Sequence, residues 1–197
     1  FRVNVFRKVT GVGAVFRHIP GTVPTLAQLG MPRVLVDFCD YHQGMVLVTG
    51  STGTGKSTTL AAMINHLNET RNLNIISLED PIEFVHPSKN SQVIQRELNT
   101  HVRSFADGVR SAMREDPDVI LVGELRDAET IMMAMTAAET GHLVLGTLHT
   151  TGAVKTIDRI IDALPGELRE QTKAFLAMSL KAVVTQVLVK TVDGKGR

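Results

Sequence analysis

The stretch Gly50–Ser57 restricts the fold of this chain more than any other part of its sequence. It reads GSTGTGKS and matches the phosphate-loop pattern G-x-x-x-x-G-K-S/T at every fixed position. Met45–Thr49, just before it, is a short apolar run typical of a strand buried on both faces. Lys56–Asn68 carries apolar residues at helical spacing. A chance match in a serine- and threonine-rich turn would not bring both neighbours. We therefore expect a strand–loop–helix unit that binds phosphate groups.

This phosphate loop is expected to hold ATP and Mg²⁺. Its glycines let backbone N–H groups curl around the phosphates, where the helix N-terminus adds positive potential. Lys56 would reach the β- and γ-phosphates, and the Ser57 hydroxyl would ligate Mg²⁺. The residues expected to bind the nucleotide here are Gly50, Ser51, Thr52, Gly53, Thr54, Gly55, Lys56, Ser57 and Thr58.

Beyond the phosphate loop, short apolar runs alternate with helical patterns. Further buried strands are expected at Asn74–Leu78, Asp118–Gly123 and Leu143–Thr147. This alternation predicts an α/β fold with a mostly parallel sheet covered by helices on both faces. Gln92–Leu98 fits either a strand or an edge hairpin. Val183–Val192 is β-like and precedes an expected turn at Asp193-Gly194.

The first 24 residues follow a different pattern. Phe1–Val9 and Val12–Ile19 alternate apolar and polar residues around Thr10-Gly11, which predicts a hairpin. The segment Pro20–Pro24 then reads as a stiff linker. Both ends of the chain look like cuts. We expect residues 1–24 to be the end of an N-terminal domain and its linker, and residues 25–197 to be an ATPase core truncated at its C-terminus.

Composition and charge argue against several other classes of protein. The 21 basic and 20 acidic residues include no run of Lys and Arg, so we expect no nucleic-acid partner. One cysteine, Cys39, excludes a disulfide framework and a cysteine-rich zinc site, and it fits a reducing cytoplasm. The apolar stretches are shorter than the roughly 20 residues that span a bilayer, so direct membrane insertion is not expected.

Carboxylates follow two of the expected strands. In open parallel sheets, ligands bind at the carboxyl ends of the strands. Glu124 follows the run Val119–Val122 and is assigned to Mg²⁺ through its bound waters, with activation of water as a second option. A helix-capping acid is the structural alternative. Glu79 and Glu83 compete as the base that orients the attacking water. Because Asp80-Pro81 also favours a turn, part of this cluster is equally explained as structural.

Two histidines flank the strand expected at residues 143–147. His149 lies just past its carboxyl end, where it could sense the γ-phosphate. His142 precedes the strand, about 16 Å away at a rise of about 3.3 Å per residue. By this geometry His142 is a packing or subunit-interface residue.

Three further stretches resemble the secretion ATPase superfamily. Ile76–Phe84 resembles its Asp box, Arg114–Asp127 its Walker B region, and Thr136–Thr150 its His box. They occur in the family's order behind the phosphate loop. The resemblance implies a RecA-like motor core in a homohexameric ring, with ATP held between one subunit's core and its neighbour's N-terminal lobe.

Within the superfamily the chain is most similar to the PilT-type pilus retraction ATPases. Phe1–Pro20 resembles the end of their small, PAS-like α+β N-terminal domain, and Lys155–Asp162 is also similar. Extension and type II secretion ATPases usually carry a four-cysteine zinc insert, whereas Gln186–Arg197 contains no cysteine. The resemblance therefore favours retraction over extension.

The resemblance also implies roles for particular residues. It favours Glu83 as the catalytic carboxylate, keeps Glu124 at Mg²⁺, and draws His142 into the functional set against its expected position. Arginines of the N-terminal lobe would reach the nucleotide from the neighbouring subunit, although each is equally consistent with a solvated strand face. The candidates are Arg2, Arg7 and Arg17.

Beyond the ring itself, the resemblance implies a platform protein of the inner membrane and a second retraction ATPase as partners. The motor would lie in the cytoplasm, against the inner-membrane face. Two alternatives stay open. One is a related type IV or type II secretion ATPase. The other is a ring subunit that binds ATP without hydrolysing it, which loss of a catalytic carboxylate would mark; Glu79, Glu83 and Glu124 are all present.

Overall fold

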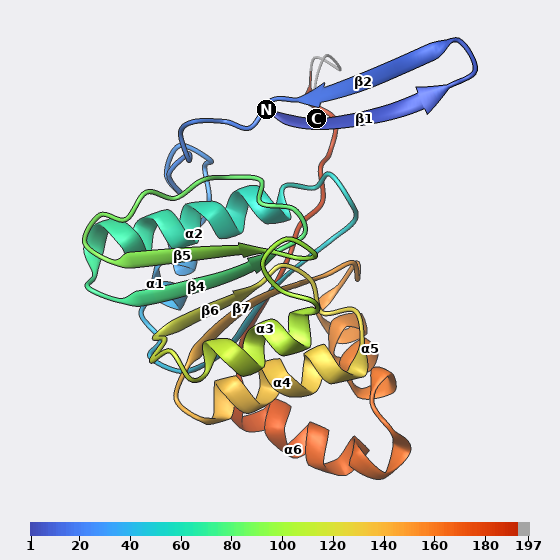
Figure 1. Ribbon diagram of the computed structural model, residues 1–197. Helices are drawn as coiled ribbons and strands as arrows, with labels where there is room; N and C mark the ends of the chain where they lie inside the picture. Colours follow the sequence, from blue (N-terminus) through green and yellow to red (C-terminus); the bar gives the residue numbers. More distant parts are fainter. Residues whose placement is uncertain (193–197) are drawn as a thin grey trace.

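A six-stranded sheet with every neighbouring pair parallel forms the centre of the fold (Figure 1). The structure is a computed structural model and describes residues 1–192. The strand order is β5-β4-β6-β7-β3-β8. The strands are β3 (Gly44–Thr49), β4 (Asn74–Glu79), β5 (Gln92–Glu97), β6 (Val119–Val122), β7 (Leu143–Leu148) and β8 (Leu180–Thr185). The prediction of a mostly parallel sheet is confirmed.

Helices cover both faces of this sheet (Figure 1). One face carries α1 (Val34–Cys39) and α2 (Lys56–Thr70). The other carries α3 (Phe105–Ala112), α4 (Ala128–Glu139), α5 (Ala153–Ala163) and α6 (Arg169–Ser179), with the short 3₁₀ helix η1 (Gly166–Leu168) before α6. Among the described residues, no helix is both long and apolar enough to cross a bilayer.

The apolar core is split into two layers by the pleat of the strands. In β3, Val46 and Val48 pack toward α1 and α2, while Met45 and Leu47 pack toward the opposite helices. Because successive side chains alternate between faces, a strand covered on both sides must be apolar at nearly every position. This explains why the central strands read as unbroken apolar runs.

The two edges of the sheet settle what the sequence left open. Within the expected stretch Gln92–Leu98, residues Gln92–Glu97 form a parallel edge strand, β5, rather than a hairpin. The β-like stretch Val183–Val192 is a strand only as far as Thr185, so the longer prediction was wrong. The reason is that β8 pairs only with β3, whose last residue, Thr49, lies opposite Thr185. The turn expected at Asp193-Gly194 lies outside the described residues.

The N-terminal hairpin is confirmed and forms a sheet of its own, β1 (Arg2–Lys8) and β2 (Gly11–Arg17), which projects away from the main sheet (Figure 1). Arg2 pairs with Arg17, so these two side chains share one face near the base of the hairpin. Arg7 pairs with Val12 near the turn and, at an odd number of residues from Arg2, lies on the other face.

Candidate nucleotide-binding site

The phosphate loop begins between two neighbouring strands. The backbone N–H of Gly50 donates to Leu148 O at 3.3 Å, and the N–H of Gln186 donates to Thr49 O at 2.8 Å. Gly50 has a φ of +143°, and a Cβ there would lie 2.4 Å from Gln186 O. Any larger residue would push β8 away from the start of the loop. Glycine is therefore required here by conformation and by space.

The two later glycines of the loop open toward empty space. Gly53 and Gly55 have φ values of +80° and +93°, in the left-handed region that glycine adopts most readily. No atom lies within 4 Å of the position that a Cβ would take at either residue. Thr54 braces the curve by donating from Oγ1 to Ser51 O at 2.8 Å. The concave side of the loop therefore fits a phosphate group.

Lys56 places a buried ammonium group against this loop. The side chain is 8% exposed, and Nζ donates to Gly50 O at 2.8 Å and to Ser51 O at 3.0 Å. Nζ also lies 3.5 Å from Nδ1 of His149. Burial lowers the pKa of Lys56, and the carboxylates of Glu124 and Glu83 act against that shift. The ammonium group of Lys56 thus interacts with the carboxylates of Glu83 and Glu124.

A cleft of about 1190 Å³, counted with its open mouth, runs along the carboxyl ends of four strands. We call it the nucleotide cleft. Most of the residues that the sequence assigned to ATP and Mg²⁺ line it. Its lining consists of Arg17, Thr52, Gly53, Gly55, Lys56, Ser57, Thr58, Asp80, Glu83, Gly123, Glu124, Arg126, Thr147 and His149.

Glu124 follows the end of β6 and is held by Arg126 and His149. Its side chain is 18% exposed, with Oε2 at 2.7 Å from Arg126 Nη2 and Oε1 at 3.1 Å from His149 Nε2. Burial alone would raise the pKa of Glu124, but hydrogen bonding and attraction from Arg126 and His149 outweigh it and lower the pKa. Glu124 is therefore ionised in the cleft. Sequence reasoning missed Arg126, although it stands two residues further along the same motif.

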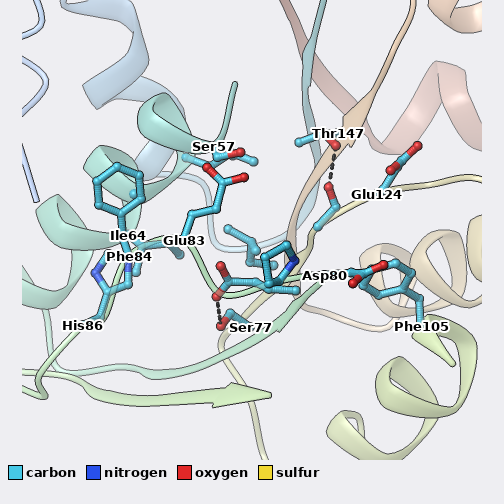
Figure 2. Close-up of a pocket in the computed structure, with 16 residues that line it drawn as sticks. Ser57, Ile64, Ser77, Asp80, Glu83, Phe84, His86, Phe105, Glu124 and Thr147 are labelled. Carbon is cyan, nitrogen blue, oxygen red and sulfur yellow. Dashed lines mark hydrogen bonds between the residues drawn. The ribbon is translucent and has the colours of Figure 1, made fainter. Parts of the chain in front are cut away.

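The two competing carboxylates of the Asp box lie in different environments. Glu83 lines the nucleotide cleft, and Figure 2 shows its carboxylate reaching toward Ser57, while Glu124 lies across the pocket. Glu79 does not line the cleft. It lines a second pocket between β4, α2 and α3, which we call the inner pocket and which shares Ser57, Glu83 and Glu124 with the cleft (Figure 2).

Glu79 is engaged by neighbouring polar groups. Its Oε1 accepts hydrogen bonds from Ser77 Oγ at 2.7 Å and from Gln95 Nε2 at 3.0 Å. Burial raises the pKa of Glu79, and hydrogen bonds from Ser77, Gln95 and the backbone of Glu83 offset only part of the shift. This carboxyl group therefore holds a proton more readily than a free glutamate and is poorly placed to meet a nucleotide.

Of the candidate histidines and arginines, some line the nucleotide cleft and others do not. His149 lines the cleft, whereas His142 lies at the opposite end of β7, with Nδ1 at 2.8 Å from Ala137 O. Arg17 lines the cleft, and together with Arg2 it borders a smaller pocket beside Pro81 and Glu83. Arg7 lines none of these pockets. Neither His142 nor Arg7 lines the cleft within a single chain. Their functional roles therefore stay predictions.

The whole chain, residues 1–197, matches the model of the type II/IV secretion system protein family. It is 59% identical to the twitching motility protein of Neisseria gonorrhoeae over 197 residues, which are 100% of this chain and 53% of that protein. It is 55% identical to the type IV pilus retraction ATPase PilT of Pseudomonas aeruginosa over 194 residues, 98% of this chain and 56% of that protein. The chain thus spans about half the length of these relatives.

A solved structure extends the likeness to three dimensions. The crystal structure of the pilus retraction motor PilT with bound ADP superposes with a TM-score of 0.96 at 48% sequence identity. The match covers 100% of this chain and 57% of that one.

His86, on the wall of the inner pocket, supplies a test of this geometry. The residue is 8% exposed, and its Nδ1 is buried without a hydrogen-bond partner. Burial, and after it the charge of Lys89, lowers the pKa of His86 from 6.5 to about 4. Between these two values the unfolded chain binds more protons than the folded one.

We expect His86→Leu to flatten the pH dependence of stability. The wild type should lose up to about 3 kcal/mol of its free energy of unfolding as the pH falls through this range. The variant lacks that titration and should lose about 3 kcal/mol less than the wild type over the same range, as urea unfolding at a series of pH values would measure. His42→Leu, which removes an exposed histidine, should follow the wild type. Equal slopes for wild type and His86→Leu would contradict a neutral, buried ring.

Proposed function

The chain belongs to the family of type II/IV secretion system proteins, and we propose that it is the ATP-hydrolysing core of a hexameric motor that retracts type IV pili. The observation that carries the proposal is the meeting of the phosphate loop, Glu83, Glu124 and His149 in one cleft. This is the set that phosphoryl transfer to water requires: a phosphate cradle, a base, a carboxylate for the metal and a group near the γ-phosphate.

In the proposed reaction Glu83 accepts a proton from water as the water oxygen attacks the γ-phosphorus. The bond from the γ-phosphorus to the β–γ bridging oxygen breaks, and ADP and inorganic phosphate leave. Lys56 and the N–H groups of the loop stabilise the negative charge on the phosphate oxygens. Figure 2 supports Glu83 over Glu79 for this role, because the Glu83 carboxylate faces Ser57.

Ser57 and Glu124 suit a Mg²⁺ ion that arrives with the nucleotide. Mg²⁺ keeps several waters and takes few protein ligands at such sites, so one hydroxyl and one ionised carboxylate are enough. When bound, the metal neutralises phosphate charge. Glu124 would bind its water ligands, and His149, which contacts both Glu124 and Lys56, would report the γ-phosphate to both.

The ring is proposed to complete the site. Residues 1–24 would belong to the N-terminal domain and residues 25–197 to the core, which agrees with the hairpin forming its own sheet. Within one chain Arg17 lines that chain's own cleft, and Arg2 borders a pocket beside it. In the ring, these two arginines at the base of the hairpin would instead contact the cleft of the adjacent subunit. The proposed partners are further copies of the chain, an inner-membrane platform protein and a second retraction ATPase, at the cytoplasmic face of the inner membrane.

Steady-state ATPase assays on the full-length protein test the chemistry. Mg²⁺-dependent turnover is expected in the wild type, and Glu83→Gln should lower kcat by about 10²- to 10⁴-fold because the base is lost. Glu124→Gln should also abolish most turnover, and both variants should still bind ATP. Glu167→Gln, an exposed glutamate outside the motifs, serves as the matched control. Assembly and ATP binding with no wild-type turnover would favour the non-hydrolysing ring subunit.

Mixing two inactive variants tests the contribution of the neighbour. Arg17→Ala and Lys56→Ala should each lose activity alone, since each removes a positive charge from the phosphates. A mixed ring contains contacts where an intact Lys56 meets an intact Arg17 on the next subunit, so activity should return on subunit exchange. Absence of any recovery in rings shown to be mixed would assign Arg17 to the cleft of its own chain.

A cellular assay tests the direction of the motor. The full-length protein should restore twitching in a bacterium whose retraction ATPase gene is deleted, whereas the Glu83→Gln variant should not. Rescue of a type II secretion ATPase deletion, with no rescue of twitching, would favour the secretion alternative.

A further inference from the structure

Glu83 stands on a segment that has no regular structure of its own. Residues 80–91 connect β4 to β5 without forming a helix or a strand. The direction of the Glu83 side chain therefore depends on what holds this segment, because no backbone ladder does so. A base that is misplaced by about 1 Å can cost about 100-fold in rate. The groups that fix the segment thus bear directly on hydrolysis.

The side chain of Gln95, on the edge strand β5, makes three hydrogen bonds around this segment. Its Nε2 donates to Phe84 O at 2.8 Å and to Glu79 Oε1 at 3.0 Å. Its Oε1 accepts from the backbone N–H of His86 at 2.8 Å. One amide thus holds the backbone one residue and three residues after Glu83, and ties both points to the end of β4.

Gln95 stands where the fold would otherwise place an apolar residue. In the β4–β5 register, Ile75 lies opposite Val93 and Ser77 lies opposite Gln95. Ile75 and Val93 pack in the apolar layer under α2, and side chains two residues further along a strand share that face. A polar pair at this position costs stability unless its groups are paired, and here they are. These hydrogen bonds direct the Gln95 amide toward residues 84–86.

Two further side chains hold the ends of the same segment. Ile82 N–H donates to Glu97 Oε2 at 3.1 Å. Asn68, fully buried on α2, donates from Nδ2 to Pro87 O at 2.8 Å and accepts from Lys89 N–H at 2.9 Å. Because α2 begins at Lys56, the helix that follows the phosphate loop also braces the far end of the Glu83 segment. Glu97 and Gln95 thus hold the backbone one residue before and one residue after Glu83, and Gln95 alone of the two also holds His86.

We propose that Gln95 is a positioning residue for hydrolysis, whose amide holds residues 84–86 so that the Glu83 carboxylate faces Ser57 and the phosphate loop. The inference rests on the proposed function, in which Glu83 is the base. Gln95 itself lines neither the nucleotide cleft nor the inner pocket. Its effect must therefore act through Glu83, which separates it from residues that touch the nucleotide.

The test compares Gln95→Ala with Gln92→Ala in the full-length protein. Gln92 is an exposed glutamine at the other end of the same strand, so its replacement is a matched control. We expect Gln95→Ala to lower kcat by about 10- to 100-fold while the Kd for ATP stays as in the wild type. Amide hydrogen exchange at Phe84 to His86 should become faster in Gln95→Ala and stay unchanged in Gln92→Ala.

Epistasis with Glu83 separates positioning from general destabilisation. In a Glu83→Gln background the base is already gone, so adding Gln95→Ala should lower the residual kcat by less than twofold. The same loss in both backgrounds, or a matching rise in the Kd for ATP, would overturn the proposal.

A second variant guards against misfolding. Gln95→Glu keeps an acceptor for the His86 N–H but puts a second carboxyl group beside Glu79. Its deficit in kcat should shrink at lower pH, where the two groups share a proton; a deficit that does not change with pH would also overturn the proposal.

If the wild type does not hydrolyse ATP, the proposed function fails, whereas unchanged exchange at residues 84–86 in Gln95→Ala refutes the brace itself.

Discussion

β3 hydrogen-bonds to β7 on one side and to β8 on the other, and this parallel pairing places the groups of the nucleotide cleft. It holds the backbone at Thr49 and Gly50 from both sides, so the phosphate loop leaves the sheet from a fixed point. Because β4 and β6 run in the same direction, the groups that follow them emerge at the same edge. The buried layers on both faces prevent a slip in register, since a slip of one residue would exchange those layers.

The cleft and the pocket beside it give three carboxylates three different surroundings. Glu124 is kept ionised by its contacts with Arg126 and His149, and Glu79 is buried so that its proton is held more strongly. Glu83 lines both the inner pocket and the nucleotide cleft, with its carboxylate toward Ser57 (Figure 2). Carboxyl groups whose surroundings shift their pKa values apart can take separate roles in one reaction. Here the separation between Glu124 and Glu79 suits a metal ligand and a structural acid.

The proposed base, Glu83, is carried by the least regular part of the site. The phosphate loop and Glu124 follow strands in the middle of the sheet, whereas Glu83 lies within residues 80–91, where side chains hold the backbone on both sides of Glu83. This gives a purpose to the edge strand β5, which contributes little to the apolar core. Its polar side chains Gln95 and Glu97 act as braces for the loop beside it. A site that combines rigid strands with a braced loop can keep its metal ligands still while its base is adjusted.

The sequence by itself determined the phosphate loop, the parallel sheet and the edge at which the functional groups gather, because these follow from local patterns and from the direction of the strands. Only the tertiary structure placed Glu83 but not Glu79 on the lining of the nucleotide cleft, found the contact of Arg126 with Glu124, and brought Arg17 but not Arg7 to the cleft. These outcomes depend on the register between distant strands and on the side-chain contacts of an irregular segment. The periodicity of the sequence predicts neither this register nor these contacts, because both arise only when residues far apart in the chain pack together.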